Sequence, residues 1–162
     1  RQQVRALKAA NNGHVSVYLP AYDHRDLIKK LTPIRGIRWH IFTKERGQEQ
    51  EIGAFRIRTV DNQAFLSSLE GCAGLISGGG FETNAEALFL GKKLLVIPMK
   101  GQYEQQCNAE ALRRMGVSVF SEVGKDFAEH VESWLSSDEV IRVDYPDESD
   151  LIVADVIRRY KR

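Results

Sequence analysis

The chain has 162 residues, of which 43% are hydrophobic and 28% are charged, a composition typical of one globular domain with a full core. Its 23 Lys and Arg residues nearly balance its 22 Asp and Glu residues, so the net charge gives no indication of a nucleic-acid partner. No apolar run reaches the roughly 18 to 20 residues of a transmembrane segment, and two cysteines suit a reducing compartment better than a disulfide framework. We therefore expect a cytoplasmic protein.

Short apolar runs typical of buried strands alternate with helical patterns along the chain. The predicted strands are residues 15–19, 37–42, 55–60, 74–77, 94–98 and 117–120. The predicted helices are 24–31, 64–69, 82–90, one whose middle is 108–115, 127–135 and 150–160. Asp23 is a candidate N-cap for the first helix, Gly116 follows the fourth as a C-cap, and the polar residues 44–53 are expected to form a loop. This alternation predicts an α/β fold with a Rossmann-like, mainly parallel sheet of about six strands and helices on both faces.

A glycine turn lies between the predicted strand 74–77 and the helix that follows it. Three glycines, Gly78 to Gly80, leave room for a ligand, and the start of the helix directs free N–H groups at one point, as an anion site requires. Two familiar motifs do not fit: Thr83 stands where a dinucleotide fingerprint needs its last glycine, and no Gly-Lys-Ser/Thr follows. By itself the turn therefore fits a tight strand-to-helix connection equally well.

Polar residues after the turn add to this pattern. Glu82 and Glu86 are four residues apart, so we expect both carboxylates on one helical face that points away from the core. That face is either simply solvated or, at Glu86, able to accept hydrogen bonds from a ribose diol. Gln105 and Asn108 likewise fit a surface residue and a helix cap when each is considered alone.

Considered together, these residues resemble a known signature. The residues Gly79-Gly80, Glu86-Ala87-Leu88, Gly91, Pro98, Glu104-Gln105 and Asn108-Ala109 are similar to the donor-binding motif in the C-terminal domain of GT-B glycosyltransferases, close to glycosyltransferase family 28 and the UDP-glucuronosyltransferase-like group. The similarity extends over about residues 77–109. It departs from many relatives at Ser77, where they have a histidine, so a hydroxyl replaces a group that can carry charge.

The resemblance implies a role for each matching position. The donor diphosphate would lie against Ser77, Gly78, Gly79, Gly80, Phe81 and Glu82, and the ribose would bind Glu86. The base would lie near Arg58, Thr59 and Val60, and the transferred sugar would contact Gly101, Glu104 and Gln105, with Gly101 letting a loop approach the donor. No catalytic residue and no metal ligand is expected in this chain, because relatives supply the general base from their N-terminal domain. No cofactor is expected either, since the nucleotide-sugar, by analogy a UDP-sugar, is a co-substrate.

By this resemblance the whole chain, 1–162, is a nucleotide-sugar binding domain and the C-terminal half of a larger two-domain enzyme. That enzyme would be an inverting, metal-independent hexosyltransferase for a cell-envelope glycan, either cytoplasmic or peripheral at the inner membrane face. The isolated chain would be inactive without its N-terminal acceptor domain or a partner subunit. Two alternatives stay open: a nucleotide-sugar epimerase of GT-B shape, and a noncatalytic or separate donor-binding subunit that needs a partner protein.

Overall fold

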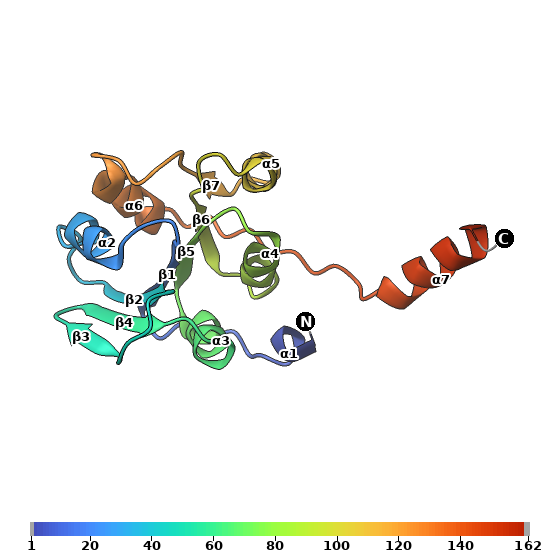
Figure 1. Ribbon diagram of the computed structural model, residues 1–162, viewed down its shortest axis with the longest axis horizontal. Coiled ribbons are helices and arrows are strands. Elements are labelled where there is room, and N and C mark those ends of the chain that lie inside the picture. Colours follow the sequence, from blue (N-terminus) through green and yellow to red (C-terminus); the bar gives the residue numbers. More distant parts are fainter. Residues whose placement is uncertain (1, 161–162) are drawn as a thin grey trace.

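Seven strands form one sheet in residues 2–160, the part of the chain that the computed structural model describes (Figure 1). The strand order is β3-β4-β2-β1-β5-β6-β7, and every pairing is parallel except that of β3 with β4. In chain order the elements are α1 (Gln2–Arg5), β1 (His14–Tyr18), α2 (His24–Leu31), β2 (Arg38–Thr43), β3 (Gln50–Ile52), β4 (Phe55–Thr59), α3 (Asn62–Gly71), β5 (Gly74–Ser77), α4 (Phe81–Phe89), β6 (Lys93–Val96), α5 (Tyr103–Arg114), β7 (Ser118–Val119), α6 (Phe127–Ser136) and α7 (Ser149–Tyr160).

The predicted α/β class and the six parallel strands are confirmed, whereas the prediction of a loop at residues 44–53 is wrong in part. Gln50–Ile52 forms β3, an antiparallel strand at the edge of the sheet, and all of its residues are exposed. A strand without a buried face shows no alternation of apolar and polar residues, so nothing in the sequence marks it. Within the described residues, none of the helices has the length and apolar character needed to span a bilayer.

Helices cover the sheet on both sides, as Figure 1 shows: α2 and α6 lie on one face, and α3, α4 and α5 lie on the other. Coverage on both faces explains why β1 and β5 are buried along almost their whole length instead of alternating. Two apolar clusters result. The first contains Leu27, Leu31, Phe127, Val131 and Trp134 against the sheet, and the second contains Val4, Phe65, Leu69, Leu88, Ala109 and Leu112.

The helix ends follow the local sequence. The Asp23 side chain caps α2 by accepting a hydrogen bond from the Arg25 N–H, as predicted. Met115 is the C-cap of α5, and Gly116 follows it with φ +95°, a left-handed conformation that glycine adopts without strain. The helix therefore ends at this glycine as predicted, although the glycine lies one residue beyond the cap. Helix α5 begins at Tyr103, however, so Glu104 and Gln105 lie on its first turn and not in a loop.

A polar cluster lies between β1, β2 and α3. The Ser68 hydroxyl is 3.1 Å from His14 Nε2, 3.0 Å from His40 Nδ1 and 2.8 Å from the Ser16 hydroxyl. The two imidazole rings stack with their centroids 3.8 Å apart. Burial, with His14 and nearby arginines as further causes, lowers the pKa of His40 to about 4, and burial also lowers the pKa of His14. Both rings are therefore neutral at pH 7.

This cluster predicts a loss of stability in mild acid. An unfolded chain takes up a proton on His40 below about pH 6.5, whereas the folded chain resists protonation until about pH 4. Stability is therefore complete above pH 6.5 and decreases as the pH falls toward 4, by roughly 2 kcal/mol after allowance for partial solvent screening. Urea denaturation between pH 7.5 and 4.5 measures this slope. The His40→Gln variant should show a shallower slope, and an unchanged slope in that variant would contradict the assignment.

The last helix, α7, extends away from the rest of the structure (Figure 1). None of its residues is buried. Its apolar side chains at 152, 153, 156, 157 and 160 fall on one helical face, and their exposed fractions range from 51% to 80%. The predicted run of cations at the end of this helix includes residues 161 and 162, which lie outside the described residues. An apolar helical face that no other element covers is normally buried against another surface.

Candidate functional site

The carboxyl ends of the parallel strands meet at one edge of the sheet, where the chain also changes direction. Strand β1 leads to α2 on one face, whereas the adjacent β5 leads to α4 on the opposite face. In open α/β sheets ligands bind outside the carboxyl ends of the strands at such a switch point. The glycine turn Gly78 to Gly80 occupies this place, directly after Ser77, the last residue of β5.

Helix α4 begins within the turn. Gly80 is its N-cap, with φ −68° and ψ 138° and no side chain to satisfy the first N–H groups. The first N–H groups of a helix have no partner within the helix, so those of Gly80, Phe81 and Glu82 are directed at the switch point. The Phe81 side chain is 74% exposed, which places it beside this opening and not in the core.

Asn84 shapes the turn from inside α4. This side chain is 2% exposed; its Oδ1 accepts a hydrogen bond from the Ser77 hydroxyl, and its Nδ2 donates to the Gly78 carbonyl at 2.9 Å. The Ser77 hydroxyl, which the sequence suggested as a phosphate ligand, is thus engaged with Asn84. Ser77 itself is 1% exposed, so it supports the turn from below.

Helix α5 holds the turn from the other side. Gln105 Oε1 accepts hydrogen bonds from the N–H groups of Gly79 at 3.1 Å and of Met99 at 3.0 Å. Asn108 Nδ2 donates to the Gly79 carbonyl at 3.0 Å. A β-carbon on Gly79 would lie 2.4 Å from the Gln105 carbonyl oxygen, so only glycine fits against α5 at this position.

Glu86 corrects one expectation from the sequence. Glu82 is exposed, but Glu86 is only 5% exposed, so the two carboxylates do not both point away from the core. Glu86 lines a cavity of about 430 Å³ on the outer side of α4, together with Gly80, Phe81, Glu82, Asn108 and residues of α1 and α5. A carboxylate beside a largely apolar cavity is suited to hydrogen-bond a diol, and Gly80, at the start of α4, lines the same cavity.

The expected base-binding residues lie at the end of β4, two strands from β1, and do not line this cavity. The Arg58 side chain pairs with Glu49 at 3.0 Å, and the Val60 N–H donates to the Thr43 carbonyl. The Thr59 hydroxyl donates to the Glu45 carbonyl at 2.8 Å. The side chain of Thr59 therefore fixes the loop after β2.

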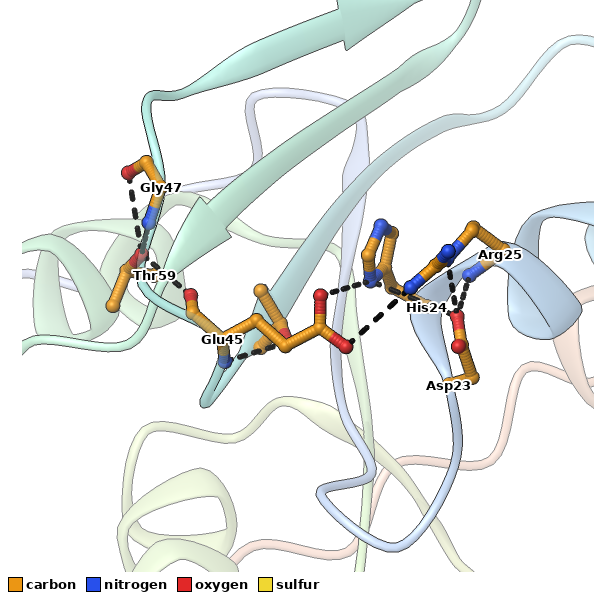
Figure 2. A network of polar contacts seen from close by, with 7 residues as sticks. Asp23, His24, Arg25, Glu45, Gly47 and Thr59 are labelled. Carbon is orange, nitrogen blue, oxygen red and sulfur yellow. Dashed lines mark hydrogen bonds and ion pairs between the residues drawn. The ribbon is translucent and has the colours of Figure 1, made fainter.

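Figure 2 shows how this loop continues into a charged network at the same edge of the sheet. The Glu45 carboxylate points toward α2, where it lies 3.7 Å from Arg25 Nη2 and 3.8 Å from His24 Nδ1. His24 Nδ1 is also 3.8 Å from Asp23, too far for a hydrogen bond in either direction. Asp23, His24 and Glu45 line a second cavity of about 270 Å³ between the loops that follow β1 and β2.

The expected sugar-binding residues are close together on one side of the turn. Gly101, with φ +77°, makes the bend before α5, and Glu104 is exposed on the first turn of that helix. Gln105 is half-buried, and its Nε2 donates to Gln102 Oε1 at 3.0 Å. The structure thus brings Gln105 into contact with the glycine turn, and Glu104 and Gly101 lie one and four residues earlier in the chain. Residues Arg58 to Val60 lie at the end of β4, a strand three positions away from β5.

Two residues of the site were missed by the sequence reasoning: Asn84 received no role, and Asn108 was considered only as a cap or as part of a motif. A signal for Asn84 was present, because it is a polar residue of low helix propensity on the same face as the buried Ala87 and Leu88. Asn108 carried no such signal, since its partner, the Gly79 carbonyl, lies 29 residues earlier in the chain.

Comparison with known proteins shows the family of the chain. The family model described as "Glycosyl transferase family 1" matches residues 1–137. The chain belongs to this family. No curated protein matches it. The chain therefore carries a glycosyltransferase donor-binding domain, and the suspected relation to the C-terminal halves of GT-B glycosyltransferases is confirmed.

Solved structures of glycosyltransferases share its fold. The glycosyltransferase SnogD from Streptomyces nogalater is 20% identical with a TM-score of 0.60, over 80% of this chain and 35% of that one. The glycotransferase of kitacinnamycin is 19% identical with a TM-score of 0.58, over 76% of this chain and 35% of that one. The solved chain of ALG13 is 16% identical with a TM-score of 0.55, over 88% of this chain and 96% of that one. This family 1 domain thus spans about a third of the two larger relatives and nearly all of the small one.

Proposed function

We propose that this chain is the donor-binding half of an inverting glycosyltransferase that uses a UDP-sugar without a divalent metal. The observation that carries the proposal is the start of α4 at the switch point between β1 and β5. The N–H groups of Gly80, Phe81 and Glu82 belong to the start of this helix, where the free N–H groups of a helix suit an anion. Family membership supports the choice of a nucleotide-sugar over other anionic ligands.

The chemistry follows from where charge develops. As the glycosidic bond of the donor breaks, negative charge increases on the departing diphosphate. N–H groups fixed at a helix start stabilise that charge without reorganisation, and one such donor typically contributes about 3 kcal/mol at the transition state. Glu86 would hold the ribose, while Glu104 and the Nε2 group of Gln105 would contact hydroxyls of the transferred sugar.

An acceptor-binding half completes the proposed enzyme. The general base and the acceptor site would come from it, so the isolated chain is expected to bind donor without transferring sugar. The exposed apolar face of α7 is our candidate for the contact surface with that half. The product would be a cell-envelope glycan, made in the cytoplasm or at the inner membrane face.

A separate donor-binding subunit is the second candidate. It is favoured by the solved chain of ALG13, because this chain covers 96% of that one, whereas it covers 35% of SnogD. In this case α7 would bind a partner protein and not another part of the same polypeptide. A nucleotide-sugar epimerase is distinguished from both by its product, because only sugar transfer releases free nucleotide.

Calorimetric titration with UDP, UDP-GlcNAc and UDP-glucose in the presence of a chelator tests the proposal. We expect saturable binding that weakens roughly tenfold in Glu86→Gln, because a neutral amide loses the charge-assisted hydrogen bonds of the carboxylate. Glu129→Gln, an exposed position on α6 on the other face of the sheet, is the matched control and should bind like the wild type. NAD should not bind.

Two results would contradict the proposal. One is equal affinity of the two glutamine variants and the wild type for UDP, since Glu86 would then have no contact with the ribose. The other is the absence of binding to every UDP compound by a folded chain.

A further inference from the structure

Gln105 connects the two turns that border the proposed donor site. Its Oε1 accepts from the Gly79 N–H, in the turn after β5, and from the Met99 N–H, in the turn after β6. A single side-chain oxygen thereby ties both turns to the first turn of α5. Its amide nitrogen points the other way, toward Gln102.

Helix α5 contacts both the N–H and the carbonyl group of Gly79. Asn108, three residues after Gln105 and thus on the same face of α5, donates to the Gly79 carbonyl at 3.0 Å. A β-carbon on Gly79 would meet the backbone of Gln105 at 2.4 Å, so the turn and the helix backbone are already packed against each other. The N–H and the carbonyl of Gly79 are therefore both occupied by α5.

We propose that Gln105 is a positioning residue that fixes the diphosphate turn through its Oε1, so that only the Nε2 hydrogen not donated to Gln102 is left for the donor. This inference rests on the proposed donor site. Because the Gly79 N–H is engaged with Gln105, the diphosphate draws on the N–H groups of Gly80, Phe81 and Glu82. The sugar side and the diphosphate side of the site are thus mechanically coupled through one carboxamide.

The two roles of Gln105, as a contact of the sugar alone and as a residue that also fixes the turn, lead to different expectations for UDP binding. If Gln105 only contacted hydroxyls of the sugar, its replacement would weaken the binding of UDP-sugars and leave the binding of UDP unchanged. If Gln105 also fixes the turn, its replacement weakens the binding of UDP as well, although UDP has no sugar beyond the ribose. The affinity for UDP therefore separates the two roles.

The test compares Gln105→Met with Gln106→Met, a matched change at the neighbouring exposed glutamine. Amide hydrogen exchange at Gly79 and Met99 is measured by NMR, and binding of UDP and UDP-GlcNAc is measured by calorimetry. We expect Gln105→Met to accelerate exchange at both amides about tenfold and to weaken the binding of UDP about tenfold. A tenfold change is the equivalent of one lost hydrogen bond. Gln106→Met should change neither quantity.

A conservative variant distinguishes the loss of the Oε1 contacts from a general loss of folding. Gln105→Glu retains an oxygen that accepts from both N–H groups but loses the amide donor, so exchange at Gly79 and Met99 should stay slow. The inference is overturned if Gln105→Met weakens only UDP-GlcNAc and leaves UDP affinity unchanged, or if exchange at both amides stays at the wild-type rate. Exchange requires no ligand, so a wild-type chain that fails to bind UDP would refute the donor site and still leave the fixing of the turn measurable.

Discussion

Replacing Gly79 with alanine is expected to abolish detectable binding of UDP and to lower the free energy of unfolding by roughly 1 to 3 kcal/mol, the usual cost of forcing an extra group into a packed region. The added β-carbon would lie 2.4 Å from the Gln105 carbonyl oxygen and 2.8 Å from its β-carbon. The obstacle is helix backbone, which cannot rotate away as a flexible side chain could. The turn must therefore separate from α5, and the start of α4 moves with it. Urea denaturation and calorimetry with UDP measure both effects.

Gly80→Ala is the matched control for this prediction. A β-carbon at Gly80 meets nothing within 4 Å, and the φ of −68° is one that alanine adopts readily. We expect normal stability but weaker UDP binding, by about tenfold, since the methyl group stands where the diphosphate approaches the helix start. Equal stability of the Gly79 variant, the Gly80 variant and the wild type would contradict the packing described here.

The contrast between these two glycines shows what the sequence could and could not provide. The run Gly78 to Gly80 after a buried strand predicted a tight turn that opens a helix, and the structure confirms it. The three positions look alike in the sequence, yet one packs against α5 and another faces open space. That difference depends on where a helix more than twenty residues later lies, which no local pattern contains.

The burial of Glu86 has a similar cause. Helical periodicity assigned the side of α4 that carries Glu82 and Glu86 to solvent, yet Glu86 is only 5% exposed. Residues of α1, more than eighty positions earlier in the chain, line the same cavity as Glu86. Periodicity describes one helix at a time, so it predicts contact with the sheet but not the cover that a distant segment provides.

Replacing Lys92 with methionine is expected to lower the free energy of unfolding by about 3 kcal/mol or more. Lys92 is 4% exposed, and its ammonium group donates to the carbonyl oxygens of Ala10 and Glu70, each at 2.6 Å, and of Cys72 at 2.8 Å. Methionine fills the space of the aliphatic stem but leaves these acceptors without their charged donor. A hydrogen bond to a charged group typically contributes about 1.5 to 3 kcal/mol, and the Cys72 carbonyl belongs to a buried residue.

Lys92 lies far from the donor site in the sheet, so the loss of stability in Lys92→Met can be distinguished from an effect on donor binding. Ala10 and Cys72 precede β1 and β5, and Lys92 precedes β6, so the ammonium group ties three segments together at the edge opposite the glycine turn. We therefore expect the folded Lys92→Met chain to bind UDP with wild-type affinity, although its urea midpoint is lower. Lys8→Met, at an exposed lysine, should leave the midpoint unchanged. A Lys92→Met midpoint equal to that of Lys8→Met would mean that the three carbonyl groups find other partners, and weakened UDP binding at full folding would mean that the two edges of the sheet are coupled.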